Sequence, residues 1–214
     1  MFGRRKKHST EIDSREMLLR TAEKLFAEYG FDGVSTRMIH HESGVNIAMI
    51  SYYFGSKEGL FQALMDGRFP VMRERLEIIR DRETTSWEKI EAIIEVYIDR
   101  MFDHVNFSKI IFREMSMKEN PEHNGLIIKY IQRNTELVLG IIKTGIEKGE
   151  FRNIDPEMTL SSMFATIFQW INLSSISEKM MNVKRKEDLY NQEHRLRLKL
   201  HLKDMMKRHL TTNI

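Results

Sequence analysis

The chain contains no cysteine, only three prolines and no long apolar run, and each absence excludes a class of protein. Without cysteine, neither a disulfide framework nor a thiolate metal site can form. The scarcity of proline, together with fifteen methionines, 41% hydrophobic and 30% charged residues, suits a soluble helical protein. A chain of 214 residues can bury a sizeable core and has room for one small and one larger domain.

Two stretches could direct the chain to a membrane, and neither has the composition that this requires. Residues 1–8 are basic, but no apolar segment follows them, so they do not form a secretory signal. Residues 158–177 contain no charged residue, yet serines, threonines, a glutamine and an asparagine interrupt any apolar run. We therefore expect a cytoplasmic protein. The net charge of +3 says little by itself about nucleic acid.

Residues 34–57 predict two short helices joined by a tight turn. Ser35 can cap the first helix, because its hydroxyl oxygen accepts a free N–H of the opening turn. Gly44 stands where the helix ends and the backbone needs a positive φ, and Asn46 can cap a second helix over 47–53. Such a pair forms a helix-turn-helix, which lays its second helix in the DNA major groove. A plain corner between two helices of a helical protein would show the same spacing.

The flanking segments carry a resemblance to a known family. Upstream, residues 15–31 place apolar side chains at helical spacing and end at a glycine, and downstream a Tyr-Tyr-Phe-Gly-Ser-Lys run follows. Residues 12–64 resemble the DNA-binding domain of the TetR family of bacterial transcriptional regulators. The landmarks in register are Phe26, Gly30, Gly44-Val45, Tyr53-Phe54 and Lys57-Leu60. The remainder is similar to the family only in length and helical character.

The expected fold class is all-α, with an N-terminal three-helix helix-turn-helix domain and a larger helical ligand-binding and dimerisation domain. We place the DNA-binding domain at residues 1–55 and the effector-binding and dimerisation domain at 56–214. Residues 1–10 are expected to be a flexible basic arm, with the first helix opening at Thr10 or Ser14. The arm is either a solubilising tail or a contact to phosphate or the minor groove.

The larger domain reads as a series of amphipathic helices. One begins at Ser56, and Pro70 is expected to kink or break it near residue 68. Further helices are predicted from a capping box at 85–88 to about 104, from 106 to 121, from 126 to 147 and after Pro156. Residues 195–202 alternate as a strand would, but the helical spacing of the leucines and methionines that follow favours a helix.

The resemblance implies which residues would touch DNA. They are Thr36, Arg37, Ile47, Ala48, Met49, Ser51, Tyr52, Tyr53 and Lys57. Ala48 and Met49 can meet thymine methyl groups but cannot read guanine, so Arg37 is the best candidate for a direct base contact. Lys57 offers a point charge to phosphate. His40 stands where the family usually has a small residue, which puts the packing of the two helices in doubt.

The helix after Pro156 has an apolar stripe, and its opposite face is small and uncharged, so it should be buried on two sides. One side can meet a second copy, as TetR-family proteins dimerise through their last helices. A tentative effector pocket, whose members could equally be ordinary core, consists of Tyr97, Met101, Phe102, Phe107, Phe112, Met115, Phe164, Phe168 and Trp170.

The resemblance thus implies a homodimeric transcriptional regulator, a repressor released from a palindromic double-stranded operator by a small apolar ligand. An activator stays possible, because the sequence does not encode where the operator lies. The alternative is a helical small-molecule or lipid-sensing or interaction module without DNA-binding activity. Catalytic motifs and zinc-binding histidine spacing are lacking, since His40-His41-Glu42 has no i, i+4 pair, so we expect no enzyme, no metal and no cofactor.

Overall fold

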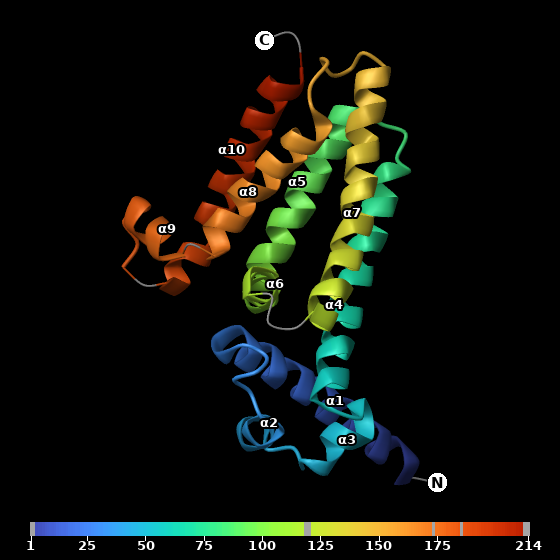
Figure 1. The fold of residues 1–214 in the computed structure, drawn as a ribbon, viewed down its shortest axis with the longest axis vertical. Coiled ribbons are helices and arrows are strands. Elements are labelled where there is room, and N and C mark those ends of the chain that lie inside the picture. The colour runs from blue at the N-terminus through green and yellow to red at the C-terminus, as the bar shows by residue number, and fades with distance from the viewer. Residues whose placement is uncertain (1–2, 118–120, 173, 185, 212–214) are drawn as a thin grey trace. The chain divides into compact units, whose positions relative to one another are not determined.

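The structure is a computed structural model that describes residues 3–117, 121–172, 174–184 and 186–211. Over these residues the regular structure is helical throughout, which confirms the all-α prediction (Figure 1). The helices are α1 (Gly3–Tyr29), α2 (Thr36–Ser43), α3 (Ala48–Phe54), α4 (Lys57–Arg80), α5 (Ser86–Asp103), α6 (Val105–Met117), α7 (Pro121–Glu147), α8 (Pro156–Asn172), α9 (Ser174–Met180), the 3-10 turn η1 (Lys186–Tyr190) and α10 (Gln192–Leu210). None of the described helices combines the length and the apolar character that crossing a membrane needs.

Contacts divide the chain into two compact units. Unit 1 consists of Met1–Pro70 and Lys109–Ile127, and unit 2 of Val71–Ser108 and Ile128–Ile214. Helices α4, α6 and α7 therefore contribute residues to both units. Whether DNA binding and effector binding divide at residues 55 and 56 stays a prediction.

Unit 1 is built on a small apolar core. Its buried side chains include Leu18, Ala22, Leu25 and Phe26 of α1, Ile39 of α2, Ile50 of α3 and Leu60 and Phe61 of α4. The predicted caps of the helix-turn-helix are present: the Ser35 hydroxyl accepts from the N–H of Met38 at 3.2 Å, and Gly44 has a φ of 68°. The Asn46 side chain accepts from the N–H of Ala48 at 2.9 Å, so local chemistry sets both ends of the turn.

The first helix is longer than the sequence predicted. Helix α1 begins at Gly3, so residues 3–10 are helical where we expected an arm without regular structure. No proline interrupts residues 3–29, and arginine, lysine and glutamate favour helix, so Thr10 and Ser14 do not act as a start. The side chains of Arg4 to Lys7 lie outside the described part, and their contact with DNA stays a prediction.

The break that we gave as one possibility at Pro70 does not occur, and a kink there stays a prediction. Helix α4 runs without interruption from Lys57 to Arg80 with Pro70 inside it. Pro70 is exposed, while Phe69 and Met72 on either side of it are buried, so apolar packing holds both turns and water can solvate the backbone there. Burial here outweighs the loss of one helical hydrogen bond.

Unit 2 is a helical bundle with one large core. The predicted capping box opens α5: the N–H of Glu88 donates to the Thr85 hydroxyl at 3.2 Å, and the N–H of Thr85 donates to the Glu88 carboxylate at 2.9 Å. The segment 195–202 is helical, as predicted, because Leu198, Leu202, Met206 and Leu210 face the core. Between α10 and α5, Lys203 pairs with Glu91 and Glu95 at 3.1 and 2.5 Å.

Candidate nucleic-acid interface

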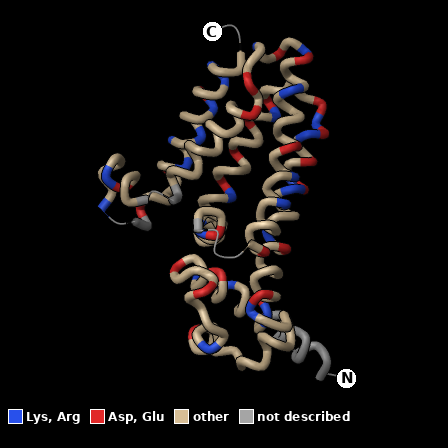
Figure 2. Tube along the Cα trace, in the orientation of Figure 1, with Lys and Arg blue, Asp and Glu red and all other residues tan. Residues whose placement is uncertain are grey.

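Helix α3 presents an uncharged, solvent-facing surface within unit 1. Only Ile50 of this helix is buried, while Ala48, Ser51 and Tyr52 are exposed, the last with 71% of its surface free. No Lys, Arg, Asp or Glu occurs in α3 (Figure 2). Methyl, hydroxyl and phenol groups are what this helix can offer to base edges, and any strong charge must come from its neighbours.

Arg37 is the nearest such neighbour in sequence. It lies in the first turn of α2, its side chain is exposed, and among the described residues it has no hydrogen bond or ion pair. Thr36 begins the same helix and is half-buried. A free guanidinium keeps all five N–H donors for a partner, which fits bidentate contact with guanine or phosphate.

His40 fixes the turn between α2 and α3 instead of disturbing it. Its ring is exposed, and Nδ1 lies 2.7 Å from the carbonyl oxygen of Val45. A carbonyl only accepts, so Nδ1 carries the proton and donates it. The larger side chain is therefore accommodated outside the packing of the two helices, and it spans Gly44 with a bond that sets the angle of the turn.

Lys57 holds the connection between α1 and α2. Its Nζ donates to the carbonyl oxygens of Phe31 and Val34 at 3.0 and 2.9 Å and lies 4.0 Å from the centroid of the Phe31 ring. Two of its three N–H groups are thereby used within unit 1, which the sequence did not reveal. A contact with phosphate through the third N–H stays a prediction.

A second pair of charges joins α1 to α2. Lys24 Nζ donates to the Glu42 carboxylate at 2.7 Å, and this bond lowers the pKa of Glu42 and raises that of Lys24. Nearby, the Ser56 side chain hydrogen-bonds to Glu58 and lowers the pKa of that carboxyl. Because Lys24 is paired, it contributes less net charge to this face than the sequence suggests.

An aromatic cluster in unit 1 joins α4, the start of α7 and the segment after α1, and no local sequence pattern indicates it. Phe61 stacks on the His123 ring with centroids 4.1 Å apart, and it meets Phe31 edge-on at 5.3 Å. The His123 Nδ1 lies 3.2 Å from the carboxylate of Glu114, and both side chains are buried. The end of α6 and the start of α7 thus belong to the packing of unit 1.

Arg113 adds a polar contact to the same support. Its Nη1 donates to the carbonyl oxygen of Glu28 at 3.2 Å, at the end of α1. Gly30 follows with a φ of 76°, and a Cβ on it would stand 3.1 Å from Nε of Arg113. The glycine therefore serves both the helix end and the close approach of this arginine.

The structure divides the predicted effector residues between the two units. Phe112 and Met115 belong to unit 1, and Phe112 is exposed; the other seven belong to unit 2. In unit 2, Tyr97 meets Phe164 edge-on at 4.8 Å, and both pack partly buried against the core. Met101, Phe102 and Phe107 are buried, and Phe168 is partly buried.

Trp170 combines burial with a free polar group. Only 9% of its surface is exposed, and its indole Nε1 has no hydrogen-bond partner among the described residues. It lines a cavity of about 320 Å³ together with Met180, Met181 and Leu198. The other residues that line it are polar: Thr166, Gln169, Ser177, Arg197 and His201. The cavity can therefore offer both apolar and polar contacts to a small molecule.

A short helix-turn-helix with an exposed second helix, within an all-helical chain, defines a DNA-binding regulator of the helix-turn-helix class. A family model described as "Bacterial regulatory proteins, tetR family" matches residues 18–64, and one described as "Tetracyclin repressor-like, C-terminal domain" matches residues 83–172. The chain belongs to the TetR family and is a transcriptional regulator.

Relatives of known name agree. The probable HTH-type transcriptional regulator YttP of Bacillus subtilis is 22% identical over 171 residues, which cover 78% of this chain and 82% of that protein. The ketosteroid transcriptional regulator KstR2 of Mycobacterium tuberculosis aligns with a TM-score of 0.74 at 18% identity, over 93% of this chain and 95% of that one. The transcriptional regulator FadR from Bacillus subtilis in complex with stearoyl-CoA aligns with a TM-score of 0.68 at 21% identity, over 89% of this chain and 96% of that one. The two structures establish the fold alone.

Proposed function

We propose that the chain is a homodimeric repressor that binds a palindromic DNA operator through α2 and α3 and leaves it when a small molecule binds. The observation that carries the proposal is the exposed surface of α3 beside the unpaired Arg37. The proposed DNA contacts are Thr36, Arg37, Ile47, Ala48, Met49, Ser51, Tyr52, Tyr53 and Lys57. Two copies would place their recognition helices in successive major grooves roughly 34 Å apart.

Arg37→Ala should weaken operator binding while leaving the fold intact. Loss of a bidentate contact to a base is worth about 1–3 kcal/mol, which is roughly a 5- to 150-fold rise in Kd. Competition titrations with the operator and with unrelated duplex DNA should show a larger loss on the operator. Arg75→Ala, which removes an equal exposed charge from unit 2, should leave both affinities unchanged. An equal loss on both DNAs would make Arg37 a phosphate contact.

The proposed dimer would form through α8 and α10. Met158 of α8 and Leu196 and Leu200 of α10 have 64%, 57% and 58% of their surfaces exposed, although all three are apolar. The small residues Ser161 and Ala165 on α8 are exposed as well. A second copy would cover this surface, which extends the expectation from the uncharged face of α8. Light scattering at micromolar concentration should give the mass of two chains.

The effector is proposed to bind in unit 2, near Trp170 and the rings of Tyr97, Phe164 and Phe168. Methionine and aromatic linings adapt to apolar or planar ligands. That a structural neighbour binds stearoyl-CoA supports a ligand with a long apolar part. Linkage requires such a ligand to bind the DNA-free form more tightly.

A gel-shift experiment distinguishes the proposed repressor from the alternative, a sensor or interaction module that does not bind DNA. Purified protein should retard duplex DNA from upstream of its own coding region, and unlabelled copies of that segment should compete better than random DNA. A chain that retards none would support the alternative. We further propose that residues 1–55 and 56–214 divide the two tasks, that the protein acts in the cytoplasm, and that it has no catalytic activity of its own.

A further inference from the structure

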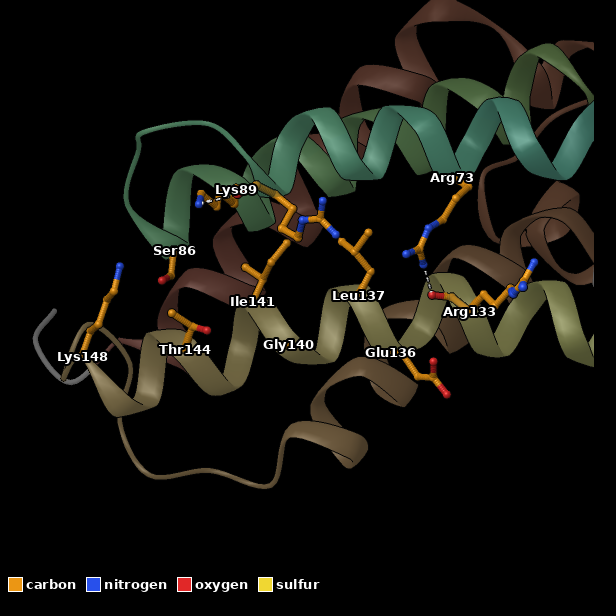
Figure 3. Close-up of a pocket in the computed structure, with 11 residues that line it drawn as sticks. Arg73, Ser86, Lys89, Arg133, Glu136, Leu137, Gly140, Ile141, Thr144 and Lys148 are labelled. Carbon is orange, nitrogen blue, oxygen red and sulfur yellow. Dashed lines mark hydrogen bonds between the residues drawn. The ribbon is translucent and has the colours of Figure 1, made fainter.

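A groove in unit 2 gathers positive charge far beyond the average of the chain. It lies between α4, the start of α5 and α7, and has a volume of about 480 Å³, within the range of small-molecule sites (Figure 3). Its cations are Arg73, Arg80, Lys89, Arg133 and Lys148, against one carboxylate, Glu136. In Figure 3 the Glu136 side chain points away from α4, so it does little to offset them.

The spacing along two helices gives the groove its shape. Arg133, Leu137, Gly140 and Thr144 follow one another at three or four residues on α7 and therefore share one face, and Lys148 comes directly after the helix ends. From Arg133 to Thr144, this face extends about 16 Å at the rise of an α-helix. Arg73 and Arg80 on α4 lie two turns apart and line the same cavity. A ligand that fills this volume must be extended.

Two cations, Arg133 within α7 and Lys148 directly after it, are free to receive a ligand. Arg133 and Lys148 are exposed, and their side chains have no hydrogen bond or ion pair among the described residues. On α4, Arg73 pairs with Glu77 at 2.6 Å and donates to the carbonyl oxygen of Arg133, and Arg80 pairs with Asp81 at 2.7 Å. The positive charge of the α4 arginines is thus partly neutralised, whereas that of Arg133 and Lys148 is not.

The floor of the groove is apolar, and the start of α5 is already satisfied. Leu137 and Ile141 have 7% and 6% of their surfaces exposed. The N–H of Ser86 donates to the Glu150 carboxylate at 2.5 Å, so this helix start does not itself attract an anion. The groove therefore offers charge at its rim and an apolar surface beneath.

We propose that this groove binds an extended, phosphate-bearing small molecule, held by Arg133 and Lys148 and by the arginines of α4. Phosphate groups match arginine and lysine donors, and an anion also relieves the mutual repulsion of five cations along one cavity. This groove is separate from the cavity at Trp170. The proposal does not rest on DNA binding, because binding of a probe to the groove can be measured without DNA.

Gly140 allows a steric test that leaves the fold intact. A Cβ at this position would meet no atom within 4 Å, and the residue is exposed within the groove. Leucine is a better helix former than glycine, so Gly140→Leu should place an apolar side chain in the groove with no conflict at its Cβ and no loss of helix propensity. Gly125→Leu is the matched control, since Gly125 is on the same helix, has equal space for a Cβ and does not line the groove.

The charge test uses Lys148→Gln and Arg133→Gln, with Lys129→Gln as control, because Lys129 is exposed on α7 outside the groove. Inorganic tripolyphosphate, ATP and coenzyme A serve as probes in titration calorimetry, in a buffer free of phosphate with 150 mM sodium chloride to screen weak surface contacts. At least one probe should bind with a Kd below about 1 mM and raise Tm. Each groove variant should raise that Kd about ten-fold, and the controls should not.

Three results would overturn the proposal. The first is no binding of any probe, and the second is binding that Gly140→Leu leaves unchanged. The third is a short DNA duplex that displaces the probe and binds more weakly to the Arg133→Gln and Lys148→Gln proteins, which would make the groove a nucleic-acid surface. Operator binding by α2 and α3 is measured separately with Arg37→Ala, so failure here leaves the regulator assignment intact.

Discussion

Phe61→Ala should destabilise unit 1 more than any other single change considered, by about 3–5 kcal/mol. The side chain is completely buried, and its ring contacts those of Phe26, Phe31 and His123 at 5.9, 5.3 and 4.1 Å between centroids. Truncation leaves a cavity bounded by three rings, which rigid aromatic neighbours cannot fill by small movements.

The location of the two tryptophans allows the loss of stability to be assigned to unit 1. Trp87 and Trp170 both lie in unit 2, so indole fluorescence reports that unit, whereas far-UV circular dichroism reports both. In urea, Phe61→Ala should move the dichroism midpoint well below the fluorescence midpoint. Phe112→Ala is the control, because 43% of that side chain is exposed, and it should cost under about 1 kcal/mol. A Phe61→Ala protein as stable as the parent would show that the aromatic cluster is not the support described.

Lys57→Ala should act on both stability and DNA. Two charge-assisted bonds and a cation–π contact disappear together, which we expect to cost about 2–4 kcal/mol of unfolding free energy. The loop over residues 31–34 then loses its tie to α4, so binding should weaken on every DNA sequence. Lys24→Ala, which removes an exposed ion pair from the same unit, should leave stability nearly unchanged.

Salt titration separates the two roles of Lys57. If its third N–H contacts phosphate, the slope of log Kd against log salt concentration should fall by about 1 in the Lys57→Ala protein, which is the value expected for the loss of one phosphate contact. If Lys57 only positions the loop, affinity falls while the slope stays as in the parent. Measurements belong at a temperature where circular dichroism shows the variant folded. Unchanged affinity and unchanged stability together would contradict both roles.

The parts of the fold that sequence reasoning predicted well are set by neighbouring residues. Ser35, Gly44 and the Thr85–Glu88 capping box act within one turn of the chain, so their chemistry is legible without tertiary structure. Where the sequence misled, a local rule was outweighed by its surroundings. Pro70 should break a helix on its own, but buried residues on both sides keep α4 continuous.

The parts that could not be predicted depend on contacts between distant residues. Lys57 reaches carbonyl groups 26 and 23 residues away, and Arg113 reaches one 85 residues away. Such partners carry no spacing signal in a single sequence. The basic groove could not be predicted for the same reason. Its arginines and lysines come from separate elements of the chain, and only the packing of α4 against α7 brings them to one cavity.

Lys57 bonds to main-chain oxygens, which every amino acid possesses. Exchange of Phe31 or Val34 for another apolar residue would keep both acceptors in place, whereas no other residue type brings an ammonium on so long a stem to position 57. The two hydrogen bonds should therefore survive a change of side chain at residue 31 or 34 but not at 57, whereas the ring contacts of Phe31 depend on that side chain itself.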